Sequence, residues 1–231
     1  MTNSYRTTLA ALALLGCAPA AIAQVTATNG TIAYTVCQFN AAVGAHVCDI
    51  WSMNPDGSGQ TNLTNTPTIS ESQPAWSADG TRLAYMRGGL GGHVLAVMNA
   101  DGTAATDITP ASVQNAPTWS PDGTRIAVSR EVPGTTISIQ YDIVVVNVNG
   151  SGEANITTRT DGLDFDEIEP AWSPDGAKIA FAAVRFEQSE DPITGLPITL
   201  AQYEIVTVNP DGSGEQILSV GDPGSIRARL L

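Results

Sequence analysis

Three arginines recur at nearly constant spacing behind a tryptophan. Arg87 and Arg130 each follow a tryptophan by eleven residues, and Arg185 follows one by thirteen. A guanidinium group binds a carboxylate through two parallel hydrogen bonds. If a repeated fold brings the three side chains to one end of the molecule, they form a cationic spot suited to a carboxylate or a sugar acid. The alternative is that each arginine pairs with a neighbouring acid.

Carboxylates gather in two segments of the C-terminal third of the chain. They are Asp161, Asp164, Asp166, Glu167, Glu169, Glu187, Glu190 and Asp191. If the fold places both segments on one rim, the rim attracts a basic protein segment or a hard cation such as calcium. The alternative is that these acids only keep a lysine-poor protein in solution.

Catalytic motifs are absent from the sequence. It contains no Gly-x-Ser-x-Gly and no His-Glu-x-x-His, and His46 and His93 are its only histidines. A Ser-His-Asp triad therefore has few ways to assemble, and we assign no catalytic residue, no metal ligand and no cofactor. A glycosidase pair of carboxylates stays open in a chain with 23 acids.

The two cysteines beyond the N-terminal segment favour a disulfide. Cys37 and Cys48 lie in two β-rich runs that flank a loop of small residues at 40–45. A hairpin in register places their sulfur atoms opposite each other, and an exported protein meets oxidising conditions. The alternative is a pair of buried free thiols.

Residues 1–23 have the pattern of a secretory signal peptide. Arg6 is followed by an apolar run, and Ala-Ile-Ala stands before Gln24. Within this segment Leu-Leu-Gly-Cys at 14–17 also fits a bacterial lipobox, in which Cys17 is lipidated and anchors the protein to a membrane. We expect a periplasmic or secreted protein, with the lipid anchor as the alternative. No second stretch reaches the roughly 18 apolar residues of a membrane helix.

Composition excludes one class of partner. The chain of 231 residues has 10 Lys plus Arg against 23 Asp plus Glu, a net charge of −13. Nucleic acid binding needs a basic footprint to displace counterions from phosphates, so we expect no nucleic acid. The 22 glycines and 14 prolines indicate many turns.

Two motifs repeat along the mature chain. Trp-Ser-x-Asp-Gly occurs at 76–80, 119–123 and 172–176, and Asn-x-Asp/Asn-Gly occurs at 54–57, 99–102, 147–150 and 209–212. Asp-Gly and Asn-Gly between β-rich runs make tight hairpin turns. An EF-hand alignment of Gly57 places Ser52 and Leu63 where acidic ligands belong. The turns are therefore predicted to be hairpins and not calcium loops.

The repeats predict an all-β fold. Each repeat reads as four antiparallel strands, and such sheets in succession form the blades of a β-propeller. We expect residues 24–231 to form about four blades, at about 31–69, 70–113, 114–163 and 164–220, with a short C-terminal tail. The first repeat has three predicted strands and lacks a tryptophan motif, so its blade is incomplete.

The motifs resemble a known family. Pro-Ala-Trp-Ser-Pro-Asp-Gly at 170–176, then Lys-Ile-Ala-Phe and Asn-Pro-Asp-Gly, is similar to the WD40-like (PD40) repeat of TolB-like proteins. The resemblance covers about residues 31–220. It implies a propeller that binds proteins in the cell envelope, with the peptidoglycan-associated lipoprotein as the partner of TolB. Family members carry an α/β domain before a six-bladed propeller, whereas four repeats are counted here.

Three forms of the propeller agree with this count. They are a closed four-bladed ring, an open arc of blades, and part of a longer propeller. We expect an open or incomplete propeller, whose terminal blades expose apolar faces through which copies associate.

The loops between second and third strands differ most in length, and variable loops on a regular scaffold carry function. We therefore expect an exported, non-catalytic scaffold that binds an envelope protein there. The alternative is a carbohydrate-active enzyme or the truncated propeller of a serine peptidase-like protein.

Overall fold

The computed structural model describes residues 24–25, 30–89, 92–109, 113–132, 140–157, 165–190 and 197–221. The predicted signal peptide at 1–23, Cys17 included, lies outside these residues, as does the predicted tail beyond residue 221. Within the described residues every regular element is a β-strand, and no helix there is long and apolar enough to cross a membrane.

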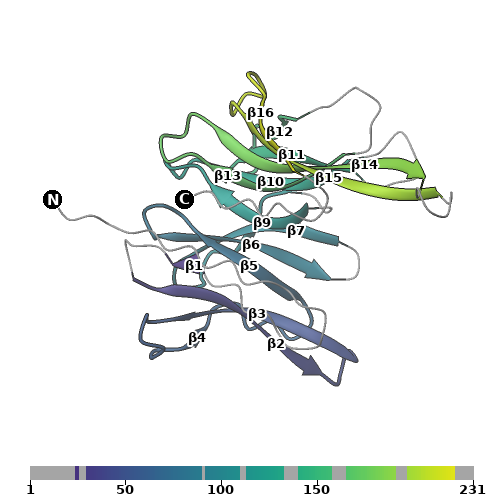
Figure 1. The fold of residues 1–231 in the computed structure, drawn as a ribbon. Coiled ribbons are helices and arrows are strands. Elements are labelled where there is room, and N and C mark those ends of the chain that lie inside the picture. Colours follow the sequence, from purple (N-terminus) through teal and green to yellow (C-terminus); the bar gives the residue numbers. More distant parts are fainter. Residues whose placement is uncertain are drawn as a thin grey trace.

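The strands form four successive antiparallel meanders, named blades 1 to 4 (Figure 1). Blade 1 contains β1 (Gln24–Val25), β2 (Ile32–Asn40), β3 (Ala45–Met53) and β4 (Thr61–Asn62). Blade 2 contains β5 (Ser70–Trp76), β6 (Arg82–Gly89), β7 (Gly92–Asn99) and β8 (Thr106–Asp107). Blade 3 contains β9 (Val113–Trp119), β10 (Arg125–Val132), β11 (Gln140–Asn147) and β12 (Ala154–Asn155). Blade 4 contains β13 (Phe165–Trp172), β14 (Ile179–Glu190), β15 (Pro197–Val208) and β16 (Gln216–Gly221).

Blade 1 has an inner strand that the sequence motifs do not predict. Gln24 and Val25 form β1, which pairs with β2 in the place that the tryptophan strands β5, β9 and β13 occupy in the other blades. The expectation of three strands in the first repeat is corrected by this pairing. The sequence does not indicate β1, because this strand has only two residues and no Trp-Ser-x-Asp-Gly motif follows it. Blade 1 is incomplete beside the others because β5, β9 and β13 have seven or eight residues each.

The repeated turns explain why the blades are so alike. In the first tryptophan turn, the Ser77 hydroxyl donates to Asp79 Oδ1 at 2.6 Å and accepts from the backbone N–H of Arg82 at 3.0 Å. Gly80 closes the turn with a φ of 69°, which favours glycine. Ser120 and Ser173 make the same contacts with Asp122 and Asp175. Local hydrogen bonds over six residues therefore set the β5–β6, β9–β10 and β13–β14 hairpins.

Three apolar clusters lie between consecutive blades. Between blades 2 and 3, for example, Met86 and Leu95 pack against Trp119 and Val144. The Trp119 indole N–H also donates to the carbonyl of Ala75 in blade 2 at 2.9 Å. Because each sheet buries one face against the previous blade and the other against the next, its strands are apolar in successive positions.

The blades form an open arc. Figure 1 places blade 1 at the bottom and blade 4 at the top, and no described strand of blade 1 pairs with one of blade 4. Among the described residues, strand pairing between blades 2 and 3 is limited to His93 with Val113, and between blades 3 and 4 to Tyr141 with Asp166. The expected open or incomplete propeller is confirmed, and the described strands do not close into a four-bladed ring.

Candidate partner-binding surface

The two ends of the blades differ in character. The tryptophan and asparagine turns lie at one end, which we call the turn end. The β2–β3 hairpin, the facing ends of β6 and β7 and the described link between blades 1 and 2 lie at the other, the loop end, with the β2–β3 hairpin at the lower right in Figure 1. The turn end is repetitive, whereas the loop end differs between blades, and variable loops on a regular scaffold are where binding sites lie.

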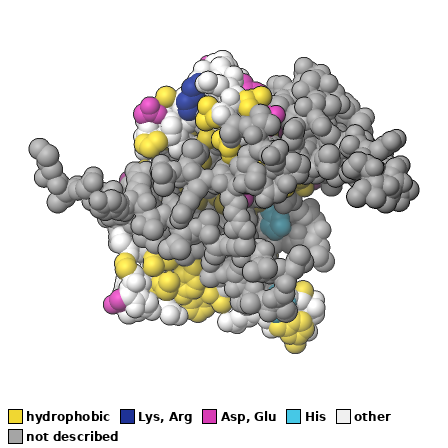
Figure 2. Space-filling view, in the orientation of Figure 1, with side chains coloured by type: hydrophobic (Ala, Val, Ile, Leu, Met, Phe, Trp, Pro, Cys, Tyr) yellow, Lys and Arg dark blue, Asp and Glu magenta, His cyan; other side chains and the backbone are white. Residues whose placement is uncertain are grey.

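An exposed apolar hairpin tip marks the loop end of blade 1. Phe39 and Val43 are 62% and 44% exposed. The ring of Phe39 meets His46 edge to face with centroids 5.7 Å apart. Contiguous exposed apolar surface marks sites of contact with other proteins, and Phe39 and Val43 belong to the same hairpin tip. In Figure 2 hydrophobic side chains protrude at the lower right, where Figure 1 places this hairpin.

The tip is held in place from two sides. Cys37 and Cys48 face each other in the β2–β3 register and form a disulfide, with Cα atoms 3.9 Å apart. The Asn40 amide donates to the carbonyl of Pro67 in the link to blade 2 at 2.6 Å. A rigid aromatic tip loses little conformational freedom when a partner binds.

A hollow of about 390 Å³ opens beside that link. Its lining residues come from the link and from blade 2, and they are Thr68, Ile69, Arg87, Gly88, Gly92, Val94 and Asp107. A Cβ atom at Gly88 would lie 2.3 Å from the carbonyl oxygen of Gly92, so this position needs glycine. The absence of side chains at both glycines keeps the hollow open.

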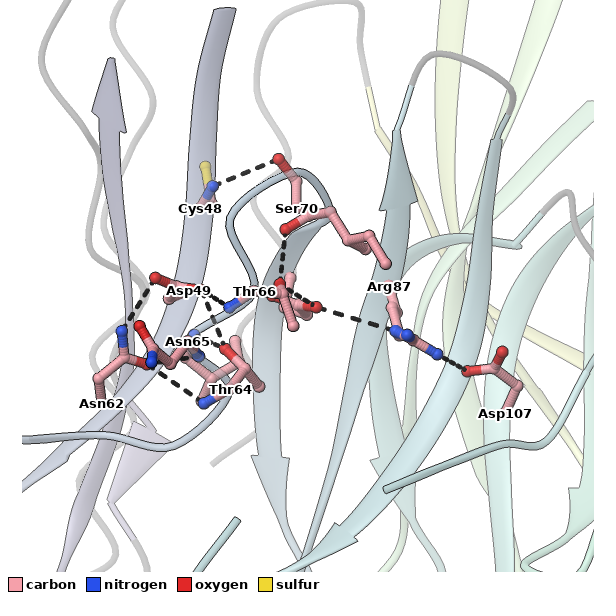
Figure 3. Close-up of polar contacts among 12 residues, drawn as sticks. Cys48, Asp49, Asn62, Thr64, Asn65, Thr66, Ser70, Arg87 and Asp107 are labelled. Atoms are coloured by element: carbon pink, nitrogen blue, oxygen red, sulfur yellow. Dashed lines mark hydrogen bonds and ion pairs between the residues drawn. The ribbon is translucent and has the colours of Figure 1, made fainter. Parts of the chain in front are cut away.

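One arginine joins the polar groups of the hollow (Figure 3). Arg87 Nη1 donates to Asp107 Oδ1 at 2.9 Å, and Arg87 Nε lies 3.8 Å from Glu71 Oε1. Glu71 is only 1% exposed, and the Thr66 hydroxyl lies 2.8 Å and 2.7 Å from its two oxygens. Burial raises the pKa of Glu71, whereas the hydrogen bond with Asp107 raises the pKa of Arg87. Two carboxylates around one guanidinium leave the site net negative when Glu71 is ionised.

The link that walls the hollow is fixed by a second group of contacts in Figure 3. Asp49 accepts from the Asn62 amide at 2.9 Å and from the backbone N–H of Thr66 at 3.0 Å. The Thr64 hydroxyl accepts from the backbone N–H of Ile50 at 3.0 Å. These bonds position Thr66, and with it Glu71, without any contribution from a ligand.

Two residue changes in blade 2 leave Asp107 available to Arg87. In blades 1 and 3 an aspartate five residues before the motif asparagine bonds an asparagine of the fourth strand, as Asp142 does with Asn155. Blade 2 has Val94 at this position and Asp107 in the place of the asparagine. The carboxylate of Asp107 therefore turns to the arginine of its own blade.

Comparison with known proteins identifies the family. The model of the TolB beta propeller domain family matches residues 23–190. The chain belongs to the TolB β-propeller family. A protein TolB homolog from Chlorobium luteolum is 34% identical over 140 residues, 60% of this chain and 29% of that protein. The aligned region thus spans less than a third of the length of this TolB relative.

Solved structures agree on the fold. A protein assigned as TolB from Agrobacterium tumefaciens has a TM-score of 0.63 at 20% identity, over 87% of this chain and 66% of that one. Oligogalacturonate lyase from Vibrio parahaemolyticus has a TM-score of 0.53 at 12% identity, over 90% of this chain and 66% of that one. At such identities the likeness shows the propeller fold alone.

The predicted arginines of this TolB-family chain do not meet as one free cationic spot among the described residues. Arg87 pairs with Glu71 and Asp107, and Arg130 pairs with Glu153 of its own blade. Arg185 lies on β14 opposite Phe165, and its side chain is outside the description. The alternative of local ion pairing thus describes Arg87 and Arg130.

The predicted acidic rim is only partly described. Glu167 on β13 is 1% exposed and lies inside the blade, whereas Asp166 beside it is half-buried. Glu187 and Glu190 lie on β14 opposite Leu200 and Pro197. Asp164 and Asp191 lie outside the described residues. Among the side chains that are described, no three His, Cys, Asp or Glu lie close enough to hold a metal ion. Calcium binding at the rim stays a prediction, and a melting temperature unchanged by millimolar calcium would contradict it.

Sequence reasoning did not single out Phe39, Val43 or Glu71. The small residues at 40–45 predict the hairpin, but they do not indicate that Phe39 and Val43 at its tip are exposed. Glu71 lies five residues before Trp76, and Glu167 lies five residues before Trp172. This shared spacing was the available sign that both glutamates occupy the inner strand of a blade.

Proposed function

We propose that this TolB-family chain is an exported, non-catalytic propeller that binds a protein of the bacterial cell envelope through its loop end. The observation that carries the proposal is the braced tip of blade 1, where Phe39 stands 62% exposed between a disulfide and the bond from Asn40 to Pro67. Interfaces are anchored by a few rigid side chains that enter a partner's pocket.

The hollow beside the tip gives the partner a second point of contact. Arg87 is about one third exposed and Asp107 about one half, so both reach solvent at the mouth of the hollow. Asp107 would receive a basic side chain of the partner, and Ile69 and Val94 offer apolar contact. A peptide with an apolar residue next to Lys or Arg matches this order of groups.

Binding of a partner is tested by capture from envelope extract. The chain is immobilised beside a Phe39→Ser variant and a Gln60→Ser control, which changes an exposed residue at the turn end. We expect the wild type and the control to retain the same protein, and the Phe39 variant to retain at least tenfold less, because truncation of a central anchor costs about 2 kcal/mol or more. The peptidoglycan-associated lipoprotein, implied by the family resemblance, is the first purified partner to test by calorimetry.

Equal capture by the Phe39 variant would refute the loop end as the contact surface. Turnover of a polysaccharide or peptide by the chain, with no protein captured, would refute the scaffold and favour an enzyme.

Export is tested by the N-terminus of the mature protein. Mass spectrometry of the chain expressed in a Gram-negative host is expected to show Gln24 as the first residue. A lipidated Cys17 at the N-terminus would place the protein on a membrane, and an intact Met1 would contradict export.

A further inference from the structure

Blade 1 carries a sheet face that repeats the buried face of blade 2. In blade 2, Leu83 pairs with Met98 and Tyr85 with Ala96. All four side chains are at most 1% exposed, because they pack against blade 1. The same pairs in blade 1 are Ile32 with Met53 and Tyr34 with Trp51. Ala33 and Ile50, which alternate with them, face blade 2. Ile32, Tyr34, Trp51 and Met53 therefore face away from blade 2, and each is only half-buried. We call this set the blade 1 face.

Blade 4 has the complementary face. The residue nine positions after each motif asparagine packs against the next blade in the first three repeats, as Leu63, Ile108 and Ile156 do. Leu218 is the equivalent residue of blade 4 and is 53% exposed. Its neighbour Ile217 is 48% exposed. Hydrophobic side chains are visible in Figure 2 both over blade 1 and near the top, where Figure 1 places β16.

The asparagine turns show how closely successive blades approach. A Cβ atom added at Gly102 would lie 2.4 Å from the carbonyl oxygen of Leu63 in the preceding blade. At Gly150 and Gly212 the corresponding distances, to Ile108 and Ile156, are 2.9 Å and 3.1 Å. Gly57 is the equivalent glycine of blade 1, and no atom of the described residues outside its own turn lies within 4 Å of a Cβ added there. Among the described residues, Leu218 and Gly57 are thus the two uncovered halves of a fourth interface of the same kind.

We propose that these two halves bind each other between two copies of the chain. The Leu218 side of blade 4 in one copy packs on the blade 1 face of the second, and the second copy returns the same contact. Such a head-to-tail interface closes when the rotation between copies completes a ring. Two copies with the four described blades each give a ring of eight blades, the upper end of the usual range for propellers, whereas three copies would give twelve blades. The interface continues the contacts between blades 1, 2, 3 and 4, and leaves the loop end free for the partner proposed above.

The test is the mass of the purified chain in solution by light scattering after gel filtration. The wild type is expected at the mass of two chains. Leu218→Asp places a charge in the interface, and Gly57→Asn fills the empty position with a residue that tolerates a positive φ. Both variants are expected at the mass of one chain. Gly44→Asn is the matched control. Gly44 has a φ of 67° and no described atom within 4 Å of an added Cβ, as at Gly57, but it lies at the loop end. This variant is expected to remain a dimer, as is Phe39→Ser.

Mixing distinguishes the head-to-tail arrangement from one in which a blade face binds the same face of the second copy. The Leu218→Asp copy keeps an intact blade 1 face, and the Gly57→Asn copy keeps an intact blade 4 face. The mixture is therefore expected to form a dimer with one copy of each, joined by a single interface. A wild type that stays at one chain mass at 100 micromolar overturns the proposal, as do dimeric Leu218→Asp and Gly57→Asn variants or a mixture that forms no mixed dimer.

Discussion

The guanidinium carbon of Arg82 lies 4.9 Å from the centre of the Trp119 ring, and the two residues belong to different blades. Arg82 Nη2 also donates to the carbonyl of Gly123 in the tryptophan turn of blade 3 at 2.7 Å. Arg125 stands at the same distance over Trp172 of blade 4. Each arginine therefore fixes the angle at which the next blade stacks. Lys178 occupies the equivalent position in blade 4, where its amino group donates to the carbonyl of Gly214 within the same blade at 3.3 Å.

Replacing Arg82 with methionine is expected to lower the free energy of unfolding by about 2 kcal/mol. Methionine keeps the apolar stem but loses the cation–π contact and the hydrogen bond, which contribute about 1 kcal/mol each. Lys178→Met is the matched control and is expected to change stability by less than about 0.5 kcal/mol. Urea unfolding followed by tryptophan fluorescence measures both, and equal losses in the two variants would contradict the role of Arg82.

The hairpins could be predicted from sequence because their hydrogen bonds span few residues. Asn149 and Asp211 stand at the same position of their turns, and each accepts from the N–H and hydroxyl of the serine two residues later. The same chemistry recurs in every copy, so the motif spacing gave the strands, the number of repeats and the all-β class.

The environment of Arg87 could not be predicted from sequence. Its contact with Glu71 depends on the register between β5 and β6, and its contact with Asp107 depends on the valine at position 94. The local sequence also does not indicate that Phe39 is exposed. Phe39 lies on the same side of β2 as the buried Ala33 and Thr35, but blade 2 no longer covers the strand there. Both features depend on how far each strand extends beyond its neighbours.

Removal of the disulfide is expected to loosen blade 1 before the others. A Cys37→Ser, Cys48→Ser double variant opens a loop whose ends are eleven positions apart in the sequence, and closing a loop of this length contributes about 3 kcal/mol. Repeat proteins lose structure unit by unit, so hydrogen exchange is expected to rise in β2 and β3 and to stay slow in β10, β11 and β14. Reducing agent is expected to raise exchange in β2 and β3 of the wild type in the same way. It is expected to leave the double variant unchanged, because that variant has no disulfide to reduce. A uniform rise in exchange across the four blades would contradict the prediction.

The turn aspartates are expected to make the fold sensitive to acid. Hydrogen bonds from Ser120, and then from Thr124, lower the pKa of Asp122 to about 2 from an ordinary value of 3.8. Because the folded state holds the proton less tightly, this group stabilises the fold above pH 4, and its contribution is lost as the pH falls toward 2. Burial raises the pKa of Glu71, so this group destabilises the fold where it is ionised and its effect on the pH dependence is opposite to that of Asp122. Glu71 is present in both the wild type and an Asp122→Asn variant, so its effect cancels in the comparison.

Asp122→Asn separates this effect from general acid unfolding. Asn149 shows that an amide oxygen in a turn of this chain accepts from the N–H and hydroxyl of the residue two positions later, as Asp122 does from Thr124. An amide oxygen at position 122 can also accept from the Ser120 hydroxyl, so the substitution removes the titration while leaving an acceptor in place. The melting temperature of the wild type is expected to fall more steeply between pH 4 and pH 2 than that of the variant, and calorimetry over this range measures the difference. Parallel curves for the two proteins would mean that the bonds to Asp122 contribute no pH-dependent stability.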